Sequence, residues 1–394
     1  MKKIIKKWKK TLSMFLILIM MVSLVACGGS GNETSSSEST EESTEKVESS
    51  NEEAESESTE EMTNEEIIVK AAEEGKVGNW GLGNEYEVQA LLTKYGCGTD
   101  FLSQDFTMDG FDDDSITLAS AMTYNELGLV KNDYEGGYGY GDSIGIIDMN
   151  DEGVAMLEDN IFTTREFATN NPNTVKAFIY ASLKGWEYAC ENPEEAAEIV
   201  YKYGSSVSSE HQLYMAKEVK KLVETDTRGN EVKDYGIMDE EAMAQTLKLA
   251  QTYIKLDDST AAERLANMTL DDIRDTQYWE AANLSKDISE IGTPEKTSVK
   301  LQLKWLPQAQ FMGYYVALDK GYYEEVGLDV EIIPGGGDIA ETTAVNNGTV
   351  DFGVTWVSNL ISANAAGMDL LQVAQVYQRS GLVLVYKKDN FMKD

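Results

Sequence analysis

A strand–helix–strand pattern near the C-terminal end of the chain constrains the fold more than any other feature. Residues 303–337, LKWLPQAQFMGYYVALDKGYYEEVGLDVEIIPGGG, contain an apolar strand that ends at Trp305, a turn at Pro307, a helix over residues 311–320 and a second strand over residues 328–333. Two strands joined by a helical crossover form a parallel pair, and such a unit normally begins an α/β domain. Here it comes when only about a quarter of the 394 residues remain, so the order of the parts requires an explanation.

Strand-like and helical runs alternate along the rest of the chain, which predicts an α/β fold with largely parallel sheets. The strand-like runs cover residues 76–80, 144–149, 299–305, 328–333, 350–356 and 382–387, and the helical runs cover residues 174–189, 193–203, 238–256 and 270–284. About 330 residues are available for folded structure, which is enough for two lobes with a sizeable core.

The N-terminal residues 1–27 have the features of a bacterial export signal. Six lysines precede the apolar run SMFLILIMMVSLVA, which is too short for a comfortable membrane span. The following sequence, LVACGG, resembles a lipobox, and this resemblance implies that Cys27 carries lipid and anchors the protein to the outer face of the cell membrane. An ordinary secretory signal with an incidental cysteine is the alternative.

Composition separates a tether from the folded body. Residues 28–61 are mainly Ser, Thr and Glu and cannot bury enough apolar surface to fold, so we expect a disordered tether. The formal net charge of the chain is −36, and most of it lies beyond the tether. An acidic body of this kind excludes nucleic acid and anionic membrane surfaces as partners.

The few Cys and His residues limit the available chemistry. Cys97 and Cys190 remain after Cys27, and we expect two buried free thiols, with a disulfide as the alternative. His211, the only histidine, lies in a polar helical pattern and is expected on the surface. The sequence therefore predicts no metal site, and it offers one poorly placed histidine as a catalytic base.

Several segments resemble a known family. Residues 304–321, GLDVEIIPGG, VDFGVTW and VYQRSG resemble the opening half of the substrate-binding proteins grouped with thiamine-pyrimidine precursor synthases and sulfonate-binding proteins. The segments VGNWGLGNEYEVQALLTKYG (77–96), AMTYNE (121–126), NDEGVAMLED (150–159) and FIYASLKGWEYACENPEEA (178–196) resemble the second half. The resemblance implies a type II periplasmic-binding-protein fold, with two α/β lobes that close on a ligand about a hinge.

The two halves occur in swapped order, which we interpret as a circular permutation. The predicted lobes are residues 66–156 and 157–394, the second built from the family's C-terminal part (157–291) and its N-terminal part (297–394). We expect the new chain ends, at residues 62–66 and Asp394, to lie near the hinge. We also expect the five-residue turn 292–296 to join ends that were already neighbours. A fragment of two tandem genes is the rival explanation.

Ligands in open α/β sheets bind beyond the carboxyl ends of the strands, so the residues that follow the predicted strands are candidates for ligand binding. From the larger lobe they are Trp305, Gln308, Gln310, Phe311, Gly336, Thr355, Trp356, Gln378 and Arg379; from the smaller lobe they are Trp80, Asn84, Glu85, Tyr86, Tyr124 and Asn125. Glu158 lies near the expected second crossover, where it is a candidate for contact with the ligand or the hinge. Flat indoles beside side-chain amides suit a heterocycle with ring nitrogens and carbonyls. Core packing, helix capping or an internal ion pair is the alternative role for each, and Glu126 is expected to be structural.

The resemblance implies a substrate-binding protein that delivers a small nitrogen heterocycle to an ABC permease and its ATPase. Synthases of the family add a cysteine-rich iron motif and a lysine–histidine pair for a cofactor. This chain has neither, so we expect no enzymatic activity and no cofactor. Pyrimidine-binding relatives often have a histidine where Phe311 stands. A thiamine pyrimidine precursor is the favoured ligand, riboflavin is the alternative, and a pyrimidine-synthase-like enzyme or a sensor domain is less favoured. The protein is expected to be a monomer.

Overall fold

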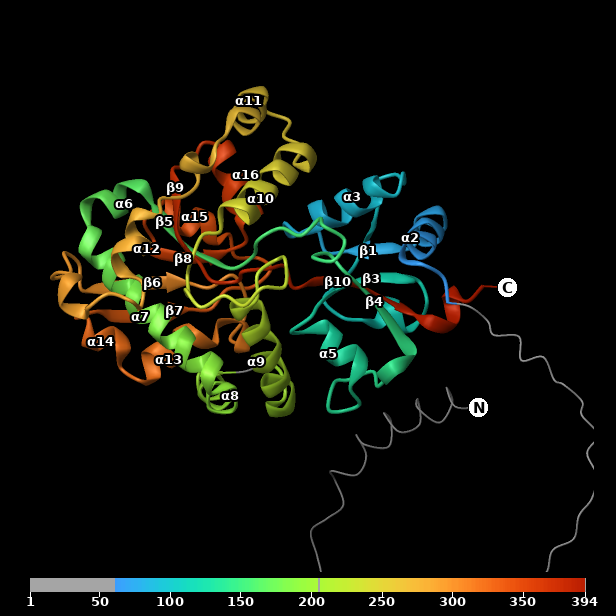
Figure 1. Cartoon of the computed structure of the whole chain (residues 1–394), viewed down its shortest axis with the longest axis horizontal. Helices are drawn as coiled ribbons and strands as arrows, with labels where there is room; N and C mark the ends of the chain where they lie inside the picture. Colours follow the sequence, from blue (N-terminus) through green and yellow to red (C-terminus); the bar gives the residue numbers. More distant parts are fainter. Residues whose placement is uncertain (1–60, 205, 394) are drawn as a thin grey trace, which may run out of the picture. The chain divides into compact units, whose positions relative to one another are not determined.

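The computed structural model describes residues 61–204 and 206–393, which contain two five-stranded sheets (Figure 1). The smaller lobe has the order β2-β1-β3-β10-β4, formed by β1 (Val77–Asn79), β2 (Leu102–Ser103), β3 (Leu118–Met122), β4 (Ile144–Asp148) and β10 (Leu382–Lys387). The larger lobe has the order β7-β6-β8-β5-β9, formed by β5 (Asn160–Thr164), β6 (Ser298–Gln302), β7 (Asp329–Ile333), β8 (Phe352–Thr355) and β9 (Leu370–Gln375). This is the two-lobed α/β architecture of the periplasmic-binding-protein class, as predicted. The sheets are mixed, not largely parallel as expected, because the pairings of β5 and β10 with their neighbours are antiparallel.

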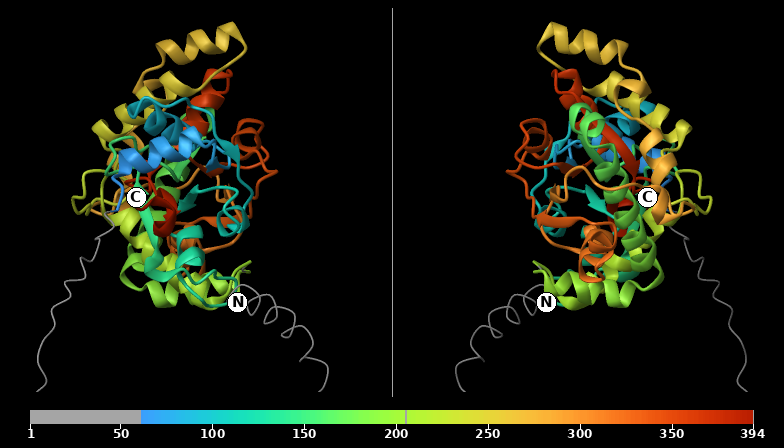
Figure 2. Two further views of the ribbon diagram at one scale, coloured as in Figure 1. Left: turned by 90° about the vertical axis from the view of Figure 1, so that its right-hand side faces the viewer. Right: turned by 90° about the vertical axis from the view of Figure 1, so that its left-hand side faces the viewer.

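Helices cover the sheets and fill the connections between strands. They are α2 (Asn64–Glu73), α3 (Glu85–Lys94), α4 (Asp109–Asp112), α5 (Glu126–Lys131), α6 (Arg165–Asn170), α7 (Pro172–Glu191), α8 (Pro193–Lys202), α9 (Ser209–Glu224), α10 (Glu240–Tyr253), α11 (Ser259–Asn267), α12 (Gln277–Ala282), α13 (Met312–Asp319), α14 (Tyr322–Glu325), α15 (Glu341–Asn346) and α16 (Val357–Ala365). Short 3-10 helices occur at η2 (Gly141–Ser143), η3 (Leu270–Asp272), η4 (Ile288–Glu290), η5 (Ala309–Phe311) and η6 (Lys388–Phe391). Helix α11 protrudes from the larger lobe (Figures 1 and 2).

The two lobes are joined by two crossover segments, residues 154–159 and 376–381. Each continues into a strand that is antiparallel to both of its neighbours, β5 in the larger sheet and β10 in the smaller one. The amides of Val376 and Tyr377 donate to the carbonyl of Asp159, 3.2 and 3.1 Å away. The Glu158 carboxylate accepts from the amide of Gly381 at 2.8 Å. The crossovers are therefore bonded to each other and form one hinge.

The placement of β10 corrects one predicted boundary. Residues 157–394 were expected to form the larger lobe alone, but β10 pairs with β3 and β4 of the smaller lobe. The chain crosses the hinge a second time at residues 376–381, so the last strand completes the smaller sheet. A mainly apolar run such as β10 fits the centre of either sheet, which is why its sequence did not reveal the lobe to which it belongs.

The ends of the described chain lie together on the smaller lobe. The amide of Met62 donates to the carbonyl of Phe391 at 3.1 Å, and Glu61 forms a β-bridge with Met392. These contacts lie beyond the last residue of β10, at the end away from the hinge (Figure 1), so the expected position near the hinge is wrong. Asp394, the signal segment 1–27 with Cys27, and the tether up to residue 60 lie outside the described residues.

The core of the larger lobe depends on close packing of α7 against α13. Pro172 begins α7 at a position that needs no amide donor, and twelve of its residues are buried. A methyl group on Gly185 would come 2.1 Å from the carbonyl oxygen of Gly313, so the two helix backbones approach more closely than larger side chains would allow. Strand β6 pairs in parallel with β7, which confirms the predicted strand pair at the opening of this lobe. In the described part of the chain, no helix is long and apolar enough to cross a membrane.

Candidate functional site

A cavity of about 60 Å³ lies between the two lobes. Its lining residues come from both: Trp80, Leu82, Phe106, Met122, Tyr124, Asn125 and Glu126 from the smaller lobe, and Lys304, Trp305, Gln308, Gln310 and Trp356 from the larger lobe. Most of these residues follow the carboxyl ends of β1, β3, β6 and β8, where parallel strands deliver their loops to one edge of each sheet. The strand ends predicted from the sequence to carry site residues therefore lie beside this cavity.

Aromatic rings form much of the cavity wall. The ring of Phe106 packs edge-on against Trp305 with centroids 4.9 Å apart, although the two residues belong to different lobes. The Trp80 indole is fixed because its Nε1 donates to the carbonyl of Asp105 at 2.9 Å. On the larger lobe, Nζ of Lys304 lies 4.5 Å from the centroid of the Trp356 ring, a cation–π distance. The cavity is therefore suited to a flat apolar ring.

The two glutamines form a directed chain of hydrogen bonds into the hinge. Nε2 of Gln308 donates to Oε1 of Gln310 at 2.8 Å, and Nε2 of Gln310 donates to Oδ2 of Asp159 at 2.9 Å. With its amide nitrogen used in this way, Gln308 offers its amide oxygen as an acceptor. On the other wall, Nδ2 of Asn125 donates to Oε1 of Glu126 at 2.7 Å and keeps its second hydrogen.

Carboxyl groups gather behind and beside the cavity, and burial raises their pKa values. The pKa of Asp159 rises to about 7 because of desolvation, and the pKa of Glu126 is also raised by burial. In the hinge, burial followed by repulsion from Glu87 raises the pKa of Glu158 well above its ordinary value, and burial raises the pKa of Glu87 to about 8. Charge on these acids is therefore costly while they remain buried.

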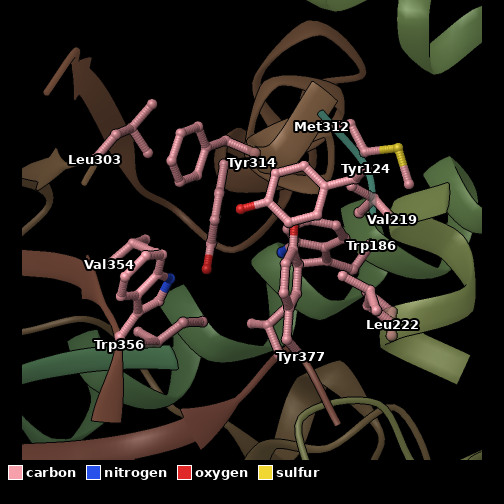
Figure 3. Close-up of a cluster of buried hydrophobic side chains, with 14 of the residues drawn as sticks. Tyr124, Trp186, Val219, Leu222, Leu303, Met312, Tyr314, Val354, Trp356 and Tyr377 are labelled. Carbon is pink, nitrogen blue, oxygen red and sulfur yellow. The ribbon is translucent and has the colours of Figure 1, made fainter. Parts of the chain in front are cut away.

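Several buried polar atoms at the back of the site make no hydrogen bond of normal geometry: Oδ1 of Asp159, Oε2 of Glu158, Nε1 of Trp356, Nε1 of Trp186 and the hydroxyl of Tyr314. Trp356 still lies close enough to Asp159, and Trp186 to Tyr314, to offset part of the rise that burial causes in the pKa of each partner. Figure 3 shows the rings of Tyr124, Trp186, Tyr314 and Tyr377 gathered in this region. Because unpaired buried polar groups are costly, such a concentration is expected where a ligand or water supplies the missing partners. Trp356 lines the cavity itself.

The structure brings together seven of the candidates named from sequence: Trp80, Tyr124, Asn125, Trp305, Gln308, Gln310 and Trp356 line the cavity. Gly336 lines an adjoining pocket that shares Trp305 and Lys304 with the cavity. Glu158 lies in the hinge, where it accepts from Ser380 and Gly381.

The remaining candidates lie outside the cavity lining. Phe311 is fully buried in the core, Thr355 donates to Glu341, and Gln378 donates to the backbone carbonyls of residues 237 and 375. Arg379 pairs with Asp148 at 3.3 Å, Glu85 accepts from the amide of Gly83, Tyr86 packs against the apolar cluster of the larger lobe, and Asn84 is buried. These side chains follow strands as expected but turn toward the protein interior.

The sequence argument missed Leu82, Phe106, Met122, Lys304 and Asp159, and assigned Glu126 a structural role only. Lys304 directly precedes Trp305 and Met122 lies two residues before Tyr124, so a wider window around each strand end would have included them. Phe106 lies in an irregular loop after a two-residue strand, and no sequence periodicity marks it. Asp159 acts through Gln310, a contact 151 positions apart in sequence.

Two expectations about single residues need correction. His211 is buried, with both ring nitrogens hydrogen-bonded, because the smaller lobe covers the face of α9 that its polar pattern suggested was exposed. Cys190 is a buried free thiol as expected, whereas Cys97 is free but only partly buried. Among the described residues, no group of three or more His, Cys, Asp or Glu side chains could hold a metal ion.

Comparison with known proteins is consistent with this architecture. The family model described as "NMT1/THI5 like" matches residues 73–196 and 308–394, more than half of the chain. The chain belongs to this family. The NMT1/THI5-like family consists mainly of periplasmic or extracellular substrate-binding proteins, so the chain has the fold and general role of an ABC-transporter substrate-binding protein. A search of curated proteins finds no match to the chain.

Proposed function

We propose that this NMT1/THI5-like protein is a lipid-anchored, monomeric substrate-binding protein that captures a small nitrogen heterocycle, a thiamine pyrimidine precursor, and delivers it to an ABC permease and ATPase. The observation that carries the proposal is the cavity, because its aromatic walls and amide side chains come from both lobes. A ligand that touches both walls stabilises the form in which the lobes are together, and a transporter can distinguish that form.

The pattern of donors and acceptors supports an aminopyrimidine. Gln308 offers an amide oxygen and Glu126 a carboxyl group, which both suit an amino group on the ligand. Trp356 offers an indole N–H and Asn125 an amide hydrogen, which suit a ring nitrogen with a lone pair. An aminopyrimidine carries both kinds of group on one flat ring, and the rings of Trp80, Trp305 and Tyr124 can contact its faces.

The lobes are in contact around the cavity, as expected for the form that retains a ligand. Oγ of Ser358, at the start of α16, donates to the carbonyl of Gly83 at 2.6 Å, and Nδ2 of Asn359 donates to the carbonyl of Leu82 at 3.3 Å. The rings of Phe106 and Trp305 form a second contact between the lobes. These bonds tie the larger lobe to the loop after β1, whose residues Trp80 and Leu82 also line the cavity.

The absence of a cysteine cluster from the sequence favours binding over synthesis, and the lipobox-like LVACGG favours anchoring through Cys27 at the outer face of the cell membrane. A cavity of about 60 Å³ is closer to one ring than to the three fused rings of a flavin, so riboflavin would require the lobes to be further apart.

The decisive experiment is calorimetric titration of the purified protein with the thiamine pyrimidine precursor and, separately, with riboflavin. We expect saturable one-to-one binding of the pyrimidine and none of riboflavin. The reverse result would establish the flavin alternative. Binding of neither would overturn the ligand assignment, and native mass spectrometry of protein from its own host would then identify the molecule that is retained. Turnover of the pyrimidine during the titration would contradict a purely binding role.

A further inference from the structure

The single histidine of the chain connects the two lobes beside the cavity. His211 lies in the first turns of α9, on the larger lobe, and only 1% of its surface is exposed. Both of its ring nitrogens are bonded to the smaller lobe: Nδ1 lies 2.6 Å from the hydroxyl of Tyr134, and Nε2 lies 2.8 Å from Oδ1 of Asn125. Asn125 itself lines the cavity.

The hydrogen-bond directions at Asn125 indicate which imidazole nitrogen carries a hydrogen. Because Nδ2 of Asn125 donates to Glu126, its Oδ1 must accept, so Nε2 of His211 carries a hydrogen. The Tyr134 hydroxyl can then donate to Nδ1, which leaves the ring neutral with both nitrogens satisfied. The same arrangement fixes the orientation of the Asn125 amide, so its nitrogen, not its oxygen, remains available to a ligand.

Other contacts of α9 show that this interface exists only while the lobes are together. The ring of Tyr214 stacks on the His211 ring with centroids 5.8 Å apart, and the Tyr214 hydroxyl donates to the carbonyl of Thr123 at 2.8 Å. Gly128 of α5 faces the Tyr214 ring, and a methyl group on Gly128 would come 2.2 Å from a carbon of that ring. Both partners of the imidazole, and the surface that covers it, therefore belong to the lobe that moves away on opening.

We propose that His211 is a proton-sensitive latch: the neutral imidazole holds the two lobes together over the cavity, and protonation of the ring favours their separation and the release of the ligand. The release of ligand rests on the proposed binding function, whereas the latch between the lobes does not.

The surroundings of His211 do not offer a charged partner to stabilise an imidazolium. On α9 the neighbouring groups are Glu210 and Tyr214, and from the smaller lobe they are Tyr134, Asn125 and, beyond Asn125, Glu126. Asp133 and Glu135 flank Tyr134 but are exposed. No carboxylate bonds to the ring directly, and burial lowers the pKa of His211 from 6.5 to about 4.

The direction of the pH effect follows from this difference. When the lobes separate, the imidazole becomes exposed and its pKa returns toward about 6.5. The open form then binds the proton better than the closed form, so closure is fully available above about pH 6.5 and weakens as the pH falls toward 4. With a His211 pKa of about 4 in the closed form and about 6.5 in the open form, proton linkage predicts that ligand affinity falls about thirty-fold between pH 7.5 and pH 5.

Two buried acids act in the opposite direction. Burial raises the pKa of Asp159 to about 7 and that of Glu87 to about 8. If opening exposes these acids, low pH therefore favours the closed form, in which they are buried and protonated. The His211→Gln variant separates the effects, because glutamine can donate and accept in place of the neutral ring but cannot become charged, and both acids remain unchanged.

The first test needs no ligand. In proton NMR of the ligand-free protein, the single histidine gives one resolved titration, and we expect a pKa well below 6 in the wild type. In Gly128→Ala, whose methyl group holds α5 away from α9, we expect the pKa to move toward 6.5. Gly98→Ala, which places a methyl group in open space, serves as the control. A histidine that keeps its low pKa in Gly128→Ala would be buried by its own lobe, and the latch would be refuted.

The second test measures affinity for the thiamine pyrimidine precursor at pH 7.5 and pH 5 by calorimetry, after circular dichroism shows that each protein is folded. We expect the wild type to lose about ten- to thirty-fold more affinity on acidification than His211→Gln. Equal losses in the two proteins would overturn the proposal. If this probe does not bind at either pH, the ligand assignment fails, and the NMR experiment still decides the latch.

Discussion

Trp305 lines the cavity and packs in a T-shaped arrangement with Phe106 of the opposite lobe, so in the proposed complex it contributes contact area to both ligand and closure. Replacement of Trp305 by alanine should weaken ligand binding by about 1 to 3 kcal/mol through lost stacking and buried area, and should leave the fold intact. Titration calorimetry measures this change. Tyr201→Ala, on an exposed ring of α8 that does not line the cavity, is the matched control and should bind as the wild type does. Unchanged affinity in Trp305→Ala would remove this residue from the binding site.

Asp159 makes stability depend on pH. Its pKa is raised to about 7 by burial, and one of its oxygens has no partner, so the native state favours the protonated acid. In the unfolded chain the same group titrates near 3.9. The contribution of Asp159 is therefore fully present below about pH 4 and is lost as the pH rises through 7, by at most about 4 kcal/mol.

Asp159→Asn should remove this dependence, because asparagine can still accept from Gln310 and cannot ionise. We expect the difference in urea-unfolding free energy between pH 5 and pH 8 to be smaller in the variant than in the wild type. Exposed Asp257→Asn should behave like the wild type. A slope that is the same in all three proteins would show that Asp159 does not titrate on unfolding.

At the level of elements, the close approach of α7 and α13 determines the stability of the larger lobe. A methyl group on Gly185 would lie 2.1 Å from the carbonyl oxygen of Gly313 and 2.7 Å from Cβ of Ala317, so the helices must separate. Gly185→Ala should therefore lower the unfolding free energy by about 1 to 3 kcal/mol, although alanine favours an isolated helix by about 1 kcal/mol. Thermal and urea unfolding measure this change, with Gly98→Ala as the control. An increase in stability would mean that α13 can move at no cost.

The hinge gives a physical account of how two elements can control the whole molecule. Residues 154–159 and 376–381 are bonded to each other through Asp159 and Glu158, and their continuations become strands of opposite lobes. A change in the backbone angles of these two segments would therefore move one complete sheet relative to the other. His211 and Ser358 form hydrogen bonds between the two lobes, and small differences in the strength of these bonds select between the open and closed forms.

For the whole molecule, the permuted order remains our interpretation, and the structure supplies what such an order requires. The amide of Met62 is bonded to Phe391, so the described ends of the body are neighbours. The connection at residues 292–296 is mostly exposed but is anchored to α7, because the carboxylate of Glu295 accepts from the amides of Asn173 and Thr174. The family model matches in two separate segments, which permutation would produce and which an insertion would also produce.

A chain in the opposite order tests the physical content of this interpretation. Residues 62 and 393 would be joined by a short glycine–serine linker, and new ends would be opened between residues 292 and 294, which keeps Glu295 in place. We expect this rearranged chain to be a folded monomer by light scattering, with the same circular dichroism and ligand affinity as the parent. An exchanged dimer or an unfolded chain would show that the present order is required for the fold.

The local pattern of residues by itself determined the α/β class, the parallel pair β6–β7 and the strand ends from which seven cavity residues come. These features depend on periodicity and turn residues within short windows. The sequence runs over residues 270–284 were expected to form one helix, but the chain forms η3 and α12 there, with Arg274 between them donating to the carbonyl of Met238. Strands β2, β3, β5 and β9 were missed: β2 has only two residues, and β3, β5 and β9 are short strands buried on both faces, which show no alternation.

Only the tertiary structure decided the lobe of β10, the burial of His211 and the direction in which each strand-end side chain points. Each of these depends on contacts between residues far apart in sequence, such as His211 with Asn125, 86 positions away, and Gln310 with Asp159, 151 positions away. Whether a polar helix face is solvated or covered depends on the other lobe, and no pattern within the helix records the presence of that lobe. The sequence thus specified the class of fold and the strand ends that line the cavity, whereas contacts between the two lobes enclosed the cavity and placed His211 against Asn125.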